Sequence, residues 1–297
     1  MRRPGFGVLA ASGSATAFGV TIVTQRRLAQ NRLSVTTTLG IRFAVAAALL
    51  LLYLAVRRAP LLPVRGERRW ALLLGAFGYA GEAALFYLAL QRGTAGAVSL
   101  LFYAYPAIVT VLEVLLRLRP PRVLTFVVVA LSTVGVTLIV VTGEAVSITP
   151  AGVAFALGAA LAISVYLLLS QRLLPASPPA VVGAHVAIGA AVAILTTGFA
   201  LGTVHAGRGD AGLLLLNGAA TAVAFALLYA ALANLAAGAA AVIMTLEAFV
   251  TVGLAALVLD ETIKPLQLAG GVVVVAAAVA VALGTRTNVV DPDAPVP

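Results

Sequence analysis

The feature that most constrains this chain is a series of long apolar stretches separated by short polar connectors. A helix needs about 20 mostly apolar residues to cross the hydrocarbon core of a bilayer. Ten stretches meet that requirement: 5–25, 34–56, 70–91, 94–116, 122–142, 150–170, 178–201, 211–233, 236–259 and 265–284. The predicted fold is therefore an all-α integral membrane protein with ten transmembrane helices, and no connector is long enough for a catalytic domain.

Composition excludes several classes of function. The 297 residues are 62% hydrophobic and 10% charged, whereas soluble domains are about half apolar and about a quarter charged. The chain has no cysteine, which excludes disulfides, thiolate metal ligands and cysteine nucleophiles. The net charge of +9 fits arginine-rich cytoplasmic loops better than a nucleic-acid partner. The N-terminus could pass for a signal peptide, but its apolar stretch is interrupted and continues to Arg26, which favours a first spanning helix.

The distribution of basic residues predicts the orientation. With the N-terminus inside, twelve of the 19 Lys and Arg residues fall in inside segments, six fall outside and Arg42 lies within a helix. Basic residues favour cytoplasmic loops. Both termini are therefore expected in the cytoplasm, with the protein in the plasma membrane.

The two halves of the chain resemble each other. YLALQRGTAGAVSLLFYAYPAIVTVLEVLL (87–116) aligns with YAALANLAAGAAAVIMTLEAFVTVGLAALV (229–258), and eight of the 30 positions are identical. Each half holds five helices, and because five is odd the second copy enters the membrane from the opposite side. Inverted repeats are typical of transporters, in which substrate sits near the midplane between the repeats.

The end of each repeat carries a family resemblance. The second copy reads LEAFVTVGLAALVLDETIKPLQLAGG, which resembles the Leu-Glu-Pro, apolar run and Gly-Glu-Arg-Leu of the EamA family in the drug/metabolite transporter superfamily. Glu247 and Glu261 match the two glutamates of that pattern. In the first copy Pro106 matches the proline, whereas Tyr105 replaces the glutamate.

The resemblance implies two five-helix repeats around a central cavity, which would export or import small metabolites such as amino acids. The expected repeats are 1–146 and 147–286, followed by a polar cytoplasmic tail at 287–297. No cofactor is expected.

Three charged residues lie near the middle of predicted spans: Arg42, Glu82 and Glu247. A charge at the bilayer centre costs about 2.5–3.5 kcal/mol on insertion scales, so such residues usually face a bundle interior and mark a pathway. Each is a candidate for substrate binding or proton coupling, and the alternative for each is structural pairing. Three glycines with a spacing of three, which favour close helix packing, precede Glu82: Gly75, Gly78 and Gly81.

Further residues are weaker candidates for the cavity. His185 aligns with Arg42 at an offset of 143, so the two would approach the centre from opposite faces, although a helix-packing histidine is the main alternative. Aromatic, hydroxyl and kink-forming residues within the spans complete the candidate site: Tyr103, Tyr105, Pro106 and Thr245. Others that could line the cavity are Tyr79, Tyr87, Tyr166, Tyr229, Ser99, Asn217 and Thr221.

These observations favour a secondary transporter of small polar or amphipathic metabolites, an exporter by expectation, that works by alternating access. Proton coupling through a glutamate and a homodimer are left open. The alternative is a non-transporting membrane scaffold or a lipid flippase-like protein. An enzyme is not expected, because the sequence holds no HExxH, GxSxG or P-loop motif and its two histidines do not form a metal site.

Overall fold

The computed structural model describes residues 3–31, 33–93, 95–118, 120, 122–141, 148–205, 210–259 and 263–287. Their regular elements are α1 Pro4–Gln30, α2 Val35–Val56, α3 Arg68–Leu73, η1 Leu74–Tyr79, α4 Ala80–Leu90, α5 Ala95–Phe102, α6 Tyr105–Leu115, α7 Val123–Val141, α8 Pro150–Leu173, α9 Pro179–Ala200, α10 Ala211–Asn234, α11 Ala237–Met244, α12 Leu246–Leu259 and α13 Pro265–Thr287. The expected boundary at 146/147 and the tail beyond 287 lie outside the described residues.

The all-helical architecture is confirmed for the described residues, with nine to ten apolar helices. Nine described segments are long and apolar enough to cross a membrane, and α13, with a shorter apolar part at Pro265–Val281, corresponds to the tenth predicted stretch. Three spans consist of consecutive helical pieces: α3–η1–α4, α5–α6 and α11–α12. Helix α1 continues beyond the predicted span to Gln30, so Arg27 lies in its last turn and donates a hydrogen bond to the carbonyl of Val258.

Local sequence explains where several helices begin. The Ser34 hydroxyl accepts a hydrogen bond from the Thr37 amide at the start of α2, and Thr149 does the same for Gly152 at the start of α8. Such caps satisfy amides that have no partner within the helix. Pro150 follows the second cap, at a position where a missing N–H costs nothing.

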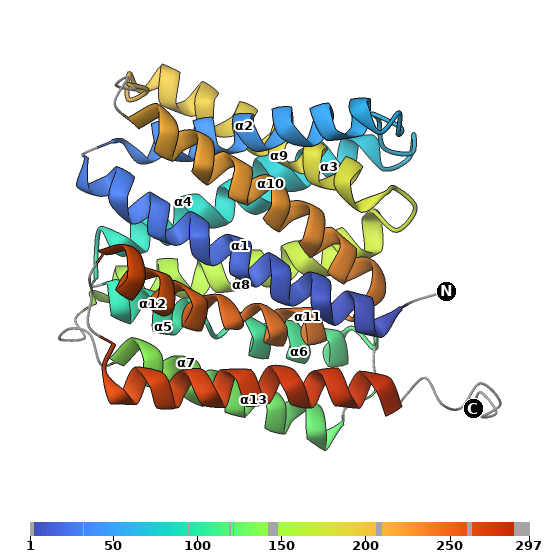
Figure 1. Cartoon of the computed structure of the whole chain (residues 1–297), viewed down its shortest axis with the longest axis vertical. Coiled ribbons are helices and arrows are strands. Elements are labelled where there is room, and N and C mark those ends of the chain that lie inside the picture. Colours follow the sequence, from blue (N-terminus) through green and yellow to red (C-terminus); the bar gives the residue numbers. More distant parts are fainter. Residues whose placement is uncertain are drawn as a thin grey trace.

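The helix contacts follow the symmetry of an inverted repeat. In a two-repeat fold α1, α2, α3–α4, α5–α6 and α7 correspond to α8, α9, α10, α11–α12 and α13. The contacts agree: α1 packs along α10 as α4 packs along α8, and α2 and α7 pack along their own counterparts, α9 and α13. Figure 1 shows α2 and α9 at one end of the bundle, α7 and α13 at the other, and α1 and α8 between them.

The glycine stripe of the third span brings two helices into backbone contact. A Cβ added at Gly75 would clash with the carbonyl of Val186 on α9, and one at Gly189 would clash with the carbonyl of Leu72. A Cβ at Gly78 would meet the ring of Tyr166, whereas one at Gly81 would meet open space. The predicted close packing therefore holds for the first two glycines of the stripe. The first two glycines of the stripe lie in the π-helix η1, a deformation that is frequent at functional sites.

Candidate functional site

Two spans are interrupted at corresponding positions. The fourth span breaks at Tyr103 and Ala104, between α5 and α6, and the ninth breaks at Thr245, between α11 and α12. Residue 245 lies 142 positions after residue 103, the offset of the sequence repeat, and α6 packs against α11. Interrupted helices in corresponding positions of two halves point to a substrate site.

Arg42, Glu82 and Glu247 come together beside these breaks, from α2, α4 and α12. Arg42 lies close enough to both carboxyl groups to interact with them electrostatically, and the two carboxyl groups interact with each other. Arg42 is 6% exposed and Glu82 is 8% exposed, while Glu247 is partly buried. The helices thus hold one cation and two carboxyl groups in buried or partly buried positions where the repeats meet.

Neutral groups hold the guanidinium of Arg42. Its Nε donates a 2.7 Å hydrogen bond to the Thr221 hydroxyl on α10, which donates to the carbonyl of Asn217 at 2.8 Å. The guanidinium carbon lies 5.1 Å from the ring centroid of Phe43 and 5.9 Å from that of Phe18. These rings favour the positive charge through their negative faces.

The remaining hydrogen-bonding capacity of this cluster is large. A guanidinium has five N–H donors, and within the described residues Nε supplies the one hydrogen bond found for Arg42. No hydrogen bond or ion pair of the Glu82 or Glu247 carboxyl group is found there either. The cluster can therefore offer donors to an anionic group and acceptors to a cationic group of the same small molecule.

The aromatic candidates at the first break lie on the side of the cluster that Glu247 occupies. Tyr103 and Tyr105 are buried, and the Phe102 ring lies 5.8 Å from the first and 5.6 Å from the second, between centroids. Both tyrosines lie near enough to Glu247 to interact with it electrostatically. The Tyr105 hydroxyl donates to the carbonyl of Ala241 at 3.2 Å, so it ties α6 to α11 across the repeat interface. Pro106, also buried, follows at the start of α6.

Two candidates do not join the cluster. His185 is buried on α9, and its Nδ1 lies 2.9 Å from the carbonyl of Val181 one turn earlier, which fits the helix-packing alternative. Thr245 donates to the carbonyl of Val242 at 2.6 Å and accepts from the Ser132 hydroxyl on α7 at 3.0 Å. Its hydroxyl thus serves the packing of α11 on α7 instead of lining a central site.

Residues that received little or no weight from the sequence complete the wall of the site. The Tyr79 ring contacts the rings of Phe43, Phe225 and Tyr166, with centroids 5.4, 5.0 and 5.5 Å away. Tyr79 also interacts electrostatically with all three charged residues of the cluster. The Tyr166 hydroxyl is hydrogen-bonded to that of Tyr229. The two phenylalanines carried no signal in the sequence, because a single ring in an apolar span is ordinary.

Comparison with known proteins agrees with this geometry. The model of the EamA-like transporter family matches residues 5–141 and again residues 150–283, which are the two repeats. A solved crystal structure shares the fold with a TM-score of 0.75 at 16% sequence identity, over 93% of this chain and 99% of the other. No protein with a curated description matches the chain.

Proposed function

This chain belongs to the EamA-like transporter family, and on that premise we propose that it is a secondary transporter of small zwitterionic metabolites such as amino acids. Membership makes it a membrane transporter of the drug/metabolite type and sets it among transporters, not enzymes. The proposal adds the substrate class, export as the direction, alternating access between the repeats, and protons as the coupling ion.

The observation that carries the proposal is the convergence of Arg42, Glu82 and Glu247. A guanidinium binds a carboxylate through two parallel hydrogen bonds, and the carboxyl groups suit an ammonium. An amino acid presents both groups on one carbon, so it can pair with the cation and an anion of the cluster at once. The buried or partly buried positions support this pairing, because charges interact more strongly where water is excluded.

The coupling step needs a group that exchanges a proton with the substrate cycle. A glutamate in the spanning region can take up or release a proton while its side of the protein is open to water. It keeps its protonation state when that side closes. Glu247 supports this role best, because it follows the break of the ninth span and is less enclosed than Glu82.

The first test compares metabolites in cells and medium for cells that overexpress wild type, Glu247→Gln or Arg42→Ala at equal membrane levels. Wild type is expected to move a small set of amino acids outward, and both variants should lose the effect. Arg57→Ala, on an exposed residue at the end of α2, is the matched control and should behave as wild type. If wild type and empty vector give the same profile on cells loaded with each amino acid, the proposed substrate class is wrong.

A second test separates binding from coupling in proteoliposomes. Exchange of labelled for unlabelled substrate needs no net proton movement, whereas accumulation under a pH gradient does. Glu247→Gln is expected to keep exchange and lose gradient-driven accumulation, because a carboxamide carries no exchangeable proton of this kind. Equal accumulation by this variant and wild type would remove Glu247 from the coupling step.

The proposed orientation has both termini in the cytoplasm. The excess of arginine on that side supports it, as does the position of the first turn of α1 and the last turn of α13 at the same side of the bundle (Figure 1). Because the chain has no cysteine, single cysteines added at each end can be labelled with an impermeant maleimide. Labelling is expected only after the cells are opened, and labelling of intact cells would reverse the orientation.

A further inference from the structure

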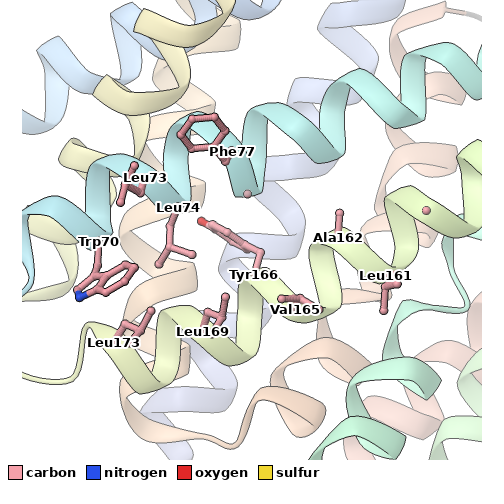
Figure 2. A pocket seen from close by; sticks show the side chains of 12 residues that line it. Trp70, Leu73, Leu74, Phe77, Leu161, Ala162, Val165, Tyr166, Leu169 and Leu173 are labelled. Carbon is pink, nitrogen blue, oxygen red and sulfur yellow. The ribbon is translucent and has the colours of Figure 1, made fainter.

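A groove runs along the side of the bundle between the segment α3–η1 and α8 (Figure 2). Its volume is about 490 Å³, within the range of small-molecule sites. Trp70 and Leu173 lie at one end, and Leu161 and Ala162 lie toward the other. None of the charged residues of the central cluster lines it.

The groove faces outward and is apolar. Phe77 on one wall is 74% exposed and Leu161 on the other is 49% exposed, so both walls face the lipid around the bundle. Gly78, Gly158 and Ala162 give the groove depth, because they carry little or no side chain. The polar side-chain groups among its lining residues are the Trp70 indole and the Tyr166 hydroxyl, and the latter is already bonded to Tyr229. The groove therefore suits a hydrocarbon chain and offers little to a polar ligand.

The groove is longer than one leaflet is deep. Its wall on α8 extends from Gly158 to Leu173, which at about 1.5 Å per residue is roughly 22 Å of helix. Half of the hydrocarbon core is about 15 Å thick. A single acyl chain of one leaflet can therefore lie along the groove, with its headgroup at the Trp70 end.

Two arginines lie at that end. Arg69 directly precedes Trp70, and its guanidinium carbon is 5.0 Å from the centroid of the Trp70 ring. Arg172 directly precedes Leu173 in the last turn of α8. Both are exposed, and in the described parts of the chain no hydrogen bond or ion pair of either guanidinium is found.

Glu67, the acidic residue nearest to Arg69 in the sequence, forms no ion pair with either arginine in the described parts of the chain. Both carboxylate oxygens of Glu67 accept hydrogen bonds from backbone amides, those of Ala176 at 2.8 Å and Ser177 at 2.9 Å. The two arginines thus place positive charge beside one end of the apolar groove, in the first turn of α3 and the last turn of α8. A phosphate carries the complementary charge and accepts hydrogen bonds from guanidinium groups.

We propose that this groove binds an anionic phospholipid, with an acyl chain between η1 and α8 and the phosphate between Arg69 and Arg172. The proposal is independent of which metabolite the protein carries. Each basic residue near a membrane surface favours anionic lipid by roughly a factor of five. The pair is therefore expected to select phosphatidylglycerol over phosphatidylcholine by at least that factor.

The single tryptophan of the chain makes a direct test available, because Trp70 lines the groove. The full protein is reconstituted in phosphatidylcholine with increasing fractions of brominated phosphatidylglycerol or of brominated phosphatidylcholine. Bromine on an acyl chain in the groove quenches Trp70 fluorescence. The fraction of brominated lipid that gives half-maximal quenching is expected to be at least about fivefold lower for phosphatidylglycerol than for phosphatidylcholine.

Variants separate headgroup selection from the groove itself. Arg69→Gln with Arg172→Gln is expected to abolish the difference between the two lipids while quenching by both persists. Arg57→Gln with Arg58→Gln, which removes the same charge from exposed residues at the end of α2, should keep the difference. Ala162→Phe, which fills the groove, should reduce quenching by both lipids.

Three results would overturn the proposal. The first is equal quenching by the two lipids in wild type, and the second is an unchanged preference in Arg69→Gln with Arg172→Gln. The third is protection of Trp70 from both lipids that disappears on dilution, which would show that a second copy of the chain covers the groove. As a control, inorganic phosphate added to vesicles that contain brominated phosphatidylglycerol should leave the quenching of Trp70 unchanged, because it cannot displace the acyl chain from the groove.

Discussion

Replacement of Gly75 by alanine tests the close approach of the third span to α9. The added Cβ would lie against backbone: 2.9 Å from the carbonyl carbon of Val186 and 3.0 Å from the amide nitrogen of Ala190, with the carbonyl oxygen of Val186 closer still. Real Cβ atoms essentially never approach other heavy atoms to under 3.0 Å, so the two helices must separate. Overpacking of this kind costs about 1–3 kcal/mol.

Gly81→Ala is the matched control on the same stripe, because a Cβ there meets nothing within 4 Å. Alanine gains up to about 1 kcal/mol of helix propensity over glycine in both variants, so the difference between them isolates the steric cost. We expect Gly75→Ala to be less stable than Gly81→Ala by about 1–3 kcal/mol, a difference of several degrees in Tm.

The assay is thermal unfolding of the purified protein in detergent, followed through the intrinsic fluorescence of its one tryptophan. Thiol-reactive dyes are excluded, because the chain has no cysteine. If the Tm of Gly75→Ala equals or exceeds that of Gly81→Ala, the third span and α9 do not touch through their backbones. The geometry of η1 would then be wrong.

Three further substitutions test individual hydrogen bonds. Asn217→Ala removes the 2.6 Å bond to the Thr24 hydroxyl that ties α10 to α1, and should cost about 1–3 kcal/mol of unfolding free energy in the same thermal assay; an unchanged Tm would contradict it. Glu67→Gln leaves one acceptor oxygen for the two backbone amides before α9, those of Ala176 and Ser177. Hydrogen exchange of one of these amides should therefore accelerate at least about tenfold. Unchanged protection of both amides would show that the carboxylate does not hold them. Thr221→Val deprives Arg42 of its 2.7 Å hydrogen bond and should raise the KM of transport about tenfold. Thr221→Ser keeps the hydroxyl and should leave the KM unchanged. Equal KM values for the two variants would show that the Thr221 hydroxyl does not position Arg42 for substrate.

The charged part of the site was predictable because charge is conspicuous in an apolar span. Arg42, Glu82 and Glu247 each interrupt a stretch that is otherwise apolar, and the cost of such a charge in lipid implies a shared interior. Thr245 was a candidate as a hydroxyl residue within a span that could line the cavity. Residues two positions apart do not share a helix face, and its hydroxyl is taken by α7, away from Glu247.

The interruptions of the helices were only half predictable. Pro106 indicates a break in the fourth span, because proline removes a backbone hydrogen bond. The break at Thr245 has neither proline nor glycine beside it, and the π-helix η1 carries no sequence signature beyond its glycines. Both depend on what the neighbouring helices impose on the backbone.

The sequence by itself determined which segments are long and apolar enough to cross a membrane, that they form two inverted copies, and which charges lie among them. Each of these is a local property, because entry of a segment into lipid depends on its own side chains. The tertiary structure decided which helices touch, that a hydroxyl and two rings hold Arg42, and that a groove opens between η1 and α8. Within lipid, apolar burial does not discriminate between helix partners, so shape, small residues and single hydrogen bonds select them.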